Sequence, residues 1–325
     1  MYLTLFLLMG YLAVAMVGIK ISSLSDSRTS FLSKEQTTIL KGLCCIIVIL
    51  VHIPAAYSNK LQDLVGSFAY IAVTIYFLLS AYGLRYSFEN KQNYADNFLR
   101  NRVIPLCIPF LTIVIAKRLL GFDPFVGGLR FVYVLLLFYA LTFIRYRLNF
   151  RGGYLIYIGV SLYSIGGYFT GVGFGWYVEA LGFAYGFLLG GEKCMTGVKS
   201  IFDKYYIKVL ILAFLSSAIL GLVYLKFKTA YFWGEYLLRI VLGIALIILI
   251  FTVMYRIKLG NRMNFLLGNI SYEVYLIHGF VICILSLMGN LLNSGLFIVL
   301  TVLISIMIAI PLHKANQFVT SRIRK

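Results

Sequence analysis

A histidine within an apolar run is the first residue of this sequence that could do chemistry. His52 follows the run from Leu43 to Val51, and Lys41 lies eleven positions before it. At about 100° per residue this spacing is roughly three helical turns, so both side chains share one face, about 16 Å apart along the axis. Ionisable side chains inside a membrane are costly and tend to mark function. We expect Pro54 to kink or open the helix beside His52. A histidine packed between helices is the alternative.

Two more polar residues stand where a bilayer should contain few. Glu179 is expected one turn below the outer surface, at the depth of His52, where its carboxylate could orient the imidazole and raise its basicity. A glutamate hydrated from outside is the alternative. His278 is expected near mid-membrane, with Tyr275 one turn earlier on a similar face. His313 borders the basic C-terminal tail and is interpreted as an interface residue.

Arg100 and Arg102 stand just before an apolar run that contains Pro105. Guanidinium groups are permanently charged and bind phosphate bidentately, so a phosphate site is one interpretation. Ordinary topology signalling, or contact with anionic lipid, is the other, and on charge alone it is favoured.

The elements that position these residues are transmembrane helices. Of the 325 residues 61% are hydrophobic and 12% are charged, whereas soluble domains are about half apolar and a quarter charged. The sequence predicts an all-α integral membrane protein with about eleven transmembrane helices in a single polytopic domain, residues 1–325. The first apolar segment has no basic residue ahead of it and no small-residue cleavage site, which favours a retained span over a cleaved signal peptide. The expected spans are 2–20, 39–58, 67–86, 103–120, 129–146, 154–171, 175–190, 207–225, 236–255, 267–287 and 294–313.

Basic residues alternate between the connecting segments. With the N-terminus outside and the C-terminus inside, the cytoplasmic segments hold 22 of the 29 lysines and arginines, a distribution that predicts orientation. The net charge of +18 is therefore a membrane feature, and we expect no nucleic-acid partner. The five cysteines show neither metal-ligand spacing nor a disulfide framework, so no metal site is expected.

Four segments together resemble the acyltransferase-3 family of membrane O-acyltransferases. They are the basic residue and histidine of 41–52, the aromatic-rich helix 72–82, the arginine segment 98–102 with Pro109 beyond it, and 270–278 with its Ser-Tyr and Tyr-Leu-x-His pattern. The likeness spans 39–313. It implies a ten-helix core, 39–325, preceded by one additional helix and a cytoplasmic loop, 1–38. Two departures are Lys41 where the family usually has arginine, which loses bidentate geometry, and Ser80-Ala81 where it usually has Ser-Gly.

The resemblance implies transfer of an acyl group, as in an O-acetyltransferase that uses acetyl-CoA and no metal. Its acceptor would be a cell-surface carbohydrate or lipid-linked sugar, and its location the bacterial cytoplasmic membrane, in contact with lipids. Lys41, Arg100 and Arg102 would hold the nucleotide phosphates, while His52, assisted by Glu179, would act as base or carry the acyl group transiently. The substrate tunnel would be lined by Tyr76, Ser80, Trp176, Tyr275 and His278.

Two other classes of function fit the same composition. A transporter or flippase for a sugar or lipid-linked substrate would also carry kinked helices and intramembrane histidines, although inverted halves are not evident in the sequence. A catalytically silent scaffold that binds acceptor or partner enzymes is the third interpretation, for which Lys41 is the only indication. The sequence leaves the acceptor, the acyl chain length and a homo-oligomeric assembly open.

Overall fold

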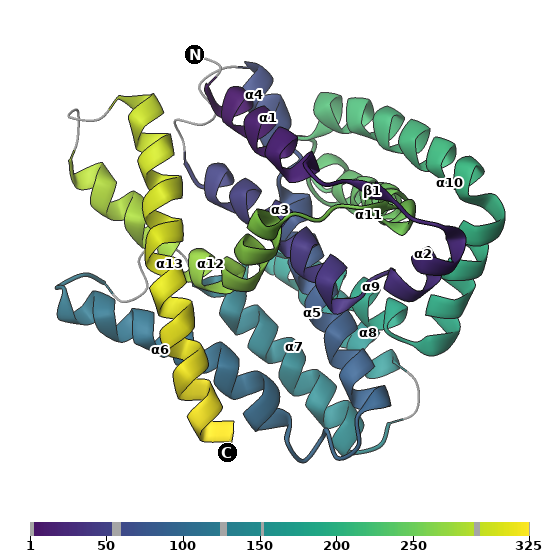
Figure 1. The fold of residues 1–325 in the computed structure, drawn as a ribbon, viewed down its shortest axis with the longest axis horizontal. Helices are drawn as coiled ribbons and strands as arrows, with labels where there is room; N and C mark the ends of the chain where they lie inside the picture. Colours follow the sequence, from purple (N-terminus) through teal and green to yellow (C-terminus); the bar gives the residue numbers. More distant parts are fainter. Residues whose placement is uncertain (1–2, 54–59, 124–128, 151–152, 289–292, 325) are drawn as a thin grey trace.

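The chain folds almost entirely into helices (Figure 1). The structure is a computed structural model that describes residues 3–53, 60–123, 129–150, 153–288 and 293–324. Each of the eleven expected spans contains an α-helix. The α-helices are α1 (Leu3–Met16), α2 (Leu24–Ser30), α3 (Lys34–Val51), α4 (Lys60–Gly66), α5 (Tyr70–Asn90), α6 (Ile104–Leu119), α7 (Arg130–Arg147), α8 (Tyr154–Thr170), α9 (Leu181–Leu189), α10 (Glu192–Phe227), α11 (Arg239–Arg256), α12 (Arg262–Leu287) and α13 (Ser294–Arg324).

Among the described residues, six helical segments are long and apolar enough to cross a membrane. By their length and composition, these apolar helices indicate a multi-pass membrane protein. The segments are Lys60–Asn90, Leu99–Leu119, Glu192–Phe227, Trp233–Arg256, Arg262–Leu287 and Ser294–Ile323.

The seventh expected span differs most from the sequence prediction. Instead of a helix over 175–190, the structure has α9, which begins only at Leu181 and has nine residues. At about 1.5 Å per residue such a helix is roughly 14 Å long, too short to cross the hydrocarbon core alone. Gly171, Gly173 and Gly175, with φ of 67°, 121° and 80°, turn the chain before it. These left-handed positions are incompatible with continuous helix.

Two helix pairs in the middle of the molecule approach each other closely at glycines. A side-chain carbon at Gly268 on α12 would lie 1.9 Å from the Thr38 carbonyl oxygen on α3, and one at Gly42 would lie 2.1 Å from the Asn264 carbonyl. Likewise, a carbon at Gly186 on α9 would lie 1.9 Å from the Leu78 carbonyl on α5. Small residues permit this backbone contact between membrane helices. The helix α3 is thereby fixed beside α12, as α9 is beside α5.

The N-terminal helix is docked onto the same centre. The Tyr11 hydroxyl donates to the Gly42 carbonyl oxygen at 2.8 Å and contacts Asn264 Oδ1 at 3.2 Å. After α1, the two-residue strand β1 (Lys20–Ile21) pairs antiparallel with β2 (Ile257–Lys258), which follows α11. The Tyr11–Asn264 contact and the strand pair tie the start of the chain to its C-terminal half.

The short helix α2 is attached to α10 and α11 by an aromatic cluster and an ion pair. Phe31 makes edge contacts with Phe202, Phe251 and Tyr255, at ring-centroid distances of 5.7, 6.0 and 5.3 Å. Arg28 forms an ion pair with Asp203 on α10. These contacts hold residues 28–34 at one rim of the central cavity described below.

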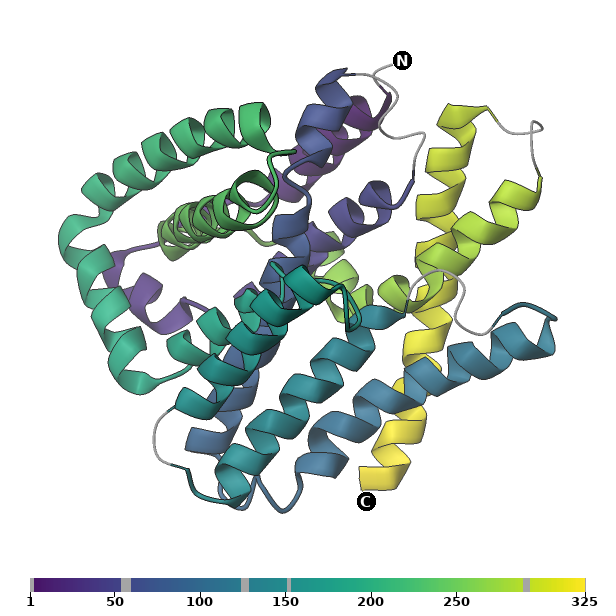
Figure 2. The same cartoon turned by 180° about the vertical axis from the view of Figure 1, so that it is seen from behind.

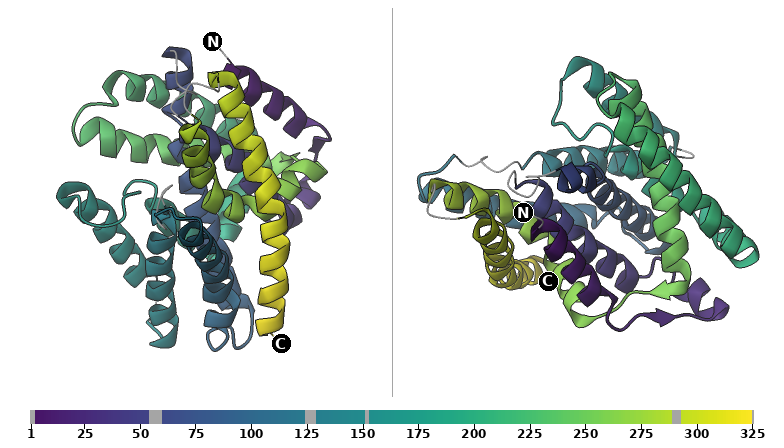
Figure 3. Two further views of the ribbon diagram at one scale, coloured as in Figure 1. Left: turned by 90° about the vertical axis from the view of Figure 1, so that its left-hand side faces the viewer. Right: turned by 90° about the horizontal axis from the view of Figure 1, so that it is seen from above.

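The remaining helices surround this centre. Seen from behind, α7 and α8 lie side by side (Figure 2), and their residues are in contact. The helix α13, drawn in yellow, runs along one side of the molecule to the C-terminus (Figure 3). Together they enclose α3, α5 and α12, from which the candidate site is built.

Candidate active site

The central feature is a cavity of about 920 Å³ between α3, α5 and α12. Residues of α6, α7, α10 and the segment 29–33 complete its wall, and Trp176 lines it as well. Cations line this cavity together with tyrosines, other hydroxyls and apolar side chains, and none of the lining residues that the structure describes is acidic. Such a composition suits an anionic ligand with an apolar portion.

The cavity brings together most of the residues singled out in the sequence. Side chains that lie far apart along the chain, on three α-helices, one π-helical segment and one turn, face the same volume. They are Lys41, His52, Tyr76, Ser80, Arg102, Trp176 and Tyr275. Arg100, Glu179 and His278 are not among its lining residues.

His52 stands at the end of α3, as its C-terminal cap, with φ −93° and ψ 0°. Active-site residues are frequent in this sparsely populated backbone region. Its Nδ1 lies 2.7 Å from the Val48 carbonyl oxygen. Because a carbonyl oxygen can only accept, Nδ1 must donate, and in the neutral ring Nε2 keeps its lone pair. The helix itself therefore orients a basic nitrogen. The kink expected at Pro54 lies outside the described residues.

His278 lies directly beside His52. The two ring centroids are 4.9 Å apart, whereas Trp176 lies 6.4 Å from His52 and Tyr275 lies 5.7 Å from His278. His278 is buried, and its Nδ1 contacts the Tyr275 carbonyl oxygen at 2.7 Å. Its Nε2 is buried with no hydrogen-bond partner among the described residues. His52 thus lines one end of the cavity, and the buried ring of His278 packs beside it; each imidazole is held by a backbone carbonyl of its own helix.

Trp176 is held in an unusual backbone conformation. Its φ is 59°, a left-handed value that is uncommon for a bulky side chain and costs on the order of 1–3 kcal/mol. Such strain clusters at functional sites. The glycine-rich turn before α9 therefore serves to bring an indole ring to the histidine end of the cavity.

Glu179 has a different partner from the one predicted. It forms an ion pair with Arg239 on α11, and the His52 imidazole that it was expected to orient is held instead through Nδ1 by the Val48 carbonyl oxygen. The Arg239 guanidinium also lies 4.6 Å from the Tyr70 ring centroid. A buried carboxylate is stabilised best by a nearby permanent cation, and α11 supplies one. The expected Glu179–His52 pair is therefore not formed.

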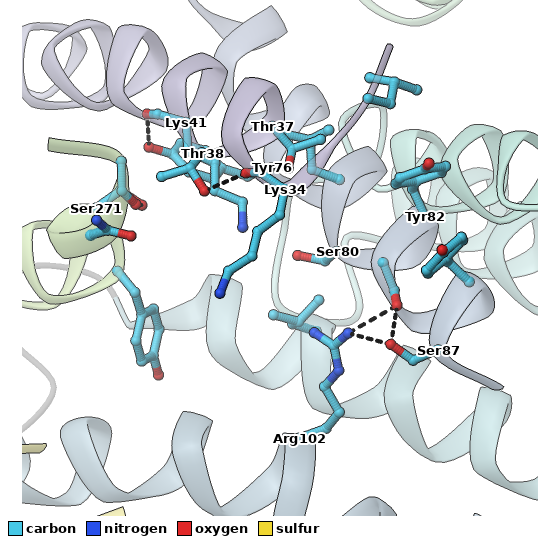
Figure 4. A pocket seen from close by; sticks show the side chains of 18 of the residues that line it. Lys34, Thr37, Thr38, Lys41, Tyr76, Ser80, Tyr82, Ser87, Arg102 and Ser271 are labelled. Atoms are coloured by element: carbon cyan, nitrogen blue, oxygen red, sulfur yellow. Dashed lines mark hydrogen bonds between the residues drawn. The ribbon is translucent and has the colours of Figure 1, made fainter. Parts of the chain in front are cut away.

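Lys41 and Arg102 stand at the other end of the cavity (Figure 4). Arg102 Nε donates to the Tyr94 hydroxyl at 2.6 Å, and Nη2 donates to the Gly83 carbonyl at 2.9 Å and contacts Ser87 Oγ at 3.3 Å. These acceptors fix the direction of the guanidinium without neutralising it. The Tyr76 hydroxyl donates to the Lys41 carbonyl oxygen at 2.7 Å, which joins α5 to α3.

Only one of the two predicted arginines faces the cavity. Arg100 and Arg102 both lie on the π-helical segment η2 (Leu99–Val103). Residues two positions apart on a helix point in nearly opposite directions. When one side of this segment lines the cavity, only one of the two arginines can therefore face it. Arg100 is the one that points elsewhere.

Sequence reasoning did not single out several lining residues. Lys34 lies seven residues before Lys41, two turns along the same helix face, so the spacing could have revealed it. No such signal marks Lys199, Ser87 or Tyr139, which reach the cavity from other helices, whereas Ser271 belongs to the Ser-Tyr pattern noted in the sequence.

Comparison with known proteins agrees with this geometry. A family model described as an acyltransferase domain, Acyl_transf_3, matches residues 37–314. The chain belongs to the acyltransferase-3 family. It has no significant match among curated proteins or among solved structures.

Membership of the acyltransferase-3 family supports acyl transfer as the activity and gives no support to the transporter interpretation. The match begins at residue 37 and so includes Lys41, His52 and the helices α5 and α12. It leaves out α1, α2 and Lys34, although residues 29–34 line the cavity.

Proposed function

We propose that this acyltransferase moves an acetyl group from cytoplasmic acetyl-CoA to a hydroxyl of a cell-surface carbohydrate or lipid-linked sugar, with His52 as the catalytic base. The observation that carries the proposal is one cavity with cations at one end and an oriented imidazole at the other. About 16 Å of α3 separates Lys41 from His52. The extended pantetheine arm of acetyl-CoA is suited to such a separation.

The cationic end would hold the nucleotide part of the donor. Lys41 and Arg102 suit the pyrophosphate, because both charges face a wall that offers no carboxylate among its described residues. The tyrosines and apolar side chains between the two ends, such as Tyr76 and Tyr139, suit the pantetheine arm.

At the other end His52 would act as general base. Nε2 accepts the proton of the acceptor hydroxyl while that oxygen attacks the thioester carbonyl carbon. The tetrahedral intermediate collapses by breaking the carbon–sulfur bond, and the proton on His52 passes to the leaving thiolate. The products are an acetyl ester and free CoA. The Val48 carbonyl, which accepts from Nδ1, stabilises the transient imidazolium, a role that the prediction gave to Glu179.

The proposal includes eleven membrane spans, an outer N-terminus and an inner C-terminus, in a bacterial cytoplasmic membrane. Support comes from the alternation of basic segments. The C-terminal ends of α7 and α13, which carry basic residues, also lie toward the same end of the molecule in Figure 1, opposite the N-terminus. Cytoplasmic donor would then enter beside Arg102, while the acceptor would approach His52 and Trp176 from outside.

A deletion strain tests the proposed activity. Nuclear magnetic resonance of its surface polysaccharide should lack O-acetyl signals that the wild type shows, and a plasmid copy of the gene should restore them. Purified protein should transfer label from acetyl-CoA to that polysaccharide. An unchanged O-acetyl spectrum together with no transfer of label would refute the proposal.

A further inference from the structure

A second cationic group stands at the rim of the cavity, farther from His52 than Lys41 and Arg102. Lys34 begins α3, about 10 Å before Lys41 along the helix axis. Lys199 of α10 lines the same cavity, as do the hydroxyl residues Thr29 and Ser33. Figure 4 shows the Lys34 side chain reaching into the cavity alongside that of Lys41.

Contacts between segments far apart in the sequence build this rim: they join residues 28–34 to α10 and α11. Arg28 of α2 forms its ion pair with Asp203, one turn after Lys199 on α10. Phe31 is inserted among Phe202, Phe251 and Tyr255. These contacts place Thr29, Ser33 and Lys34 on the same rim as Lys199.

A carboxylate close to this rim, that of Asp203, is already paired with Arg28. Asp203 forms an ion pair with Arg28, accepts a hydrogen bond from Tyr255 and does not line the cavity, although its charge also acts on Lys199 one turn before it. No acidic residue among the described lining neutralises Lys34 or Lys199. Lys91, the remaining lining cation, is close to Arg102 instead, since its ammonium lies 6.0 Å from the ring centroid of Tyr94, the tyrosine that Arg102 binds.

Five cations in two groups exceed what a pyrophosphate alone requires. If the thioester is at His52 and the pyrophosphate is at Lys41 and Arg102, the next anionic group of the donor lies farther out along α3. In coenzyme A that group is the phosphate monoester on the 3′-oxygen of the ribose, which carries about −1.5 to −2 charges near pH 7. Two ammonium groups with neighbouring hydroxyls provide charge-assisted hydrogen bonds for such a dianion.

We infer that Lys34 and Lys199 form a binding site for the 3′-phosphate of coenzyme A, built by α10 and by the segment 28–34, which precedes the region that matches the acyltransferase family model. The inference rests on the proposed function, since it takes acyl-CoA as the donor. It assigns the segment before the domain a role in choosing that donor.

Equilibrium binding of coenzyme A and of 3′-dephospho-coenzyme A to the purified full-length protein tests the inference. The wild type should bind coenzyme A roughly tenfold or more tightly than the dephospho form, at physiological ionic strength where exposed charges are screened. In Lys34→Gln/Lys199→Gln the ratio should fall toward one, because affinity for coenzyme A falls and affinity for the dephospho form stays. Lys193→Gln, an exposed lysine on the same helix as Lys199 and outside the cavity lining, should keep the wild-type ratio.

Equal binding of the two compounds by the wild type would overturn the inference, as would a double variant that weakens both equally. Thermal unfolding of each variant, compared with the wild type, separates a binding effect from misfolding, and the single variants replace the double if it unfolds early. Protein that transfers acetyl groups without this preference would contradict the inference alone. Protein that shows the preference but transfers no acetyl group would contradict the proposed function alone.

Discussion

Two regions of this membrane protein hold buried or half-buried charge, and they differ in how the charge is matched. Glu179 and Arg239 form a pair, with side-chain exposures of 7% and 27%, and Tyr70 packs on the guanidinium. The cavity holds cations with no carboxylate among the described lining. In a matched pair each charge compensates the other inside the fold, whereas like charges around an open volume repel one another and favour the binding of an anion. We therefore interpret the Glu179–Arg239 pair as part of the fold and the cations of the cavity as a binding site.

The largest expected effect concerns the matched pair. Glu179→Ala leaves the half-buried Arg239 without its carboxylate, so the free energy of unfolding should fall by about 3 kcal/mol. Thermal unfolding in detergent measures the loss. The fraction of protein that remains folded should keep its kcat. A variant with wild-type stability and a lost kcat would return Glu179 to the catalytic role predicted from the sequence.

A smaller effect is expected at Lys41. Removing its charge in Lys41→Gln should raise KM for acetyl-CoA about tenfold or more and leave kcat nearly unchanged, because a phosphate contact is made in ground and transition states alike. Steady-state kinetics at several donor concentrations checks this. Lys41→Arg should retain most of the affinity. A fall in kcat at unchanged KM would place Lys41 in the chemical step and not in donor binding.

The effect expected at His278 is smaller still. His278→Gln keeps a polar side chain beside His52 but removes the ring that packs against it at 4.9 Å. We expect kcat to fall roughly tenfold through misplacement of His52, with KM for the donor unchanged. Single-turnover measurements would show the change in the chemical step. If the loss equals that of a His52 variant, His278 takes part in the proton transfer itself.

The sequence predicted position along a helix better than contact between helices. The eleven-residue spacing of Lys41 and His52 gave their common face, because helical periodicity is local. The partner of Glu179 was missed because Arg239 lies 60 residues away on another helix. The closeness of His52 and His278 depends on the α3–α12 approach at Gly42 and Gly268, which a sequence pattern does not report. The shortness of α9 follows from three glycines whose left-handed φ becomes visible only in the structure.

The central claim is that His52 removes the proton of the acceptor hydroxyl. It is tested most directly by acetyl transfer from acetyl-CoA in His52→Gln, with coenzyme A binding measured on the same preparation. The account predicts a fall in kcat of about 10²–10⁴ with unchanged affinity for coenzyme A, since the basic nitrogen is lost and the distant cations are kept. A folded His52→Gln protein that transfers acetyl groups at the wild-type rate would contradict it.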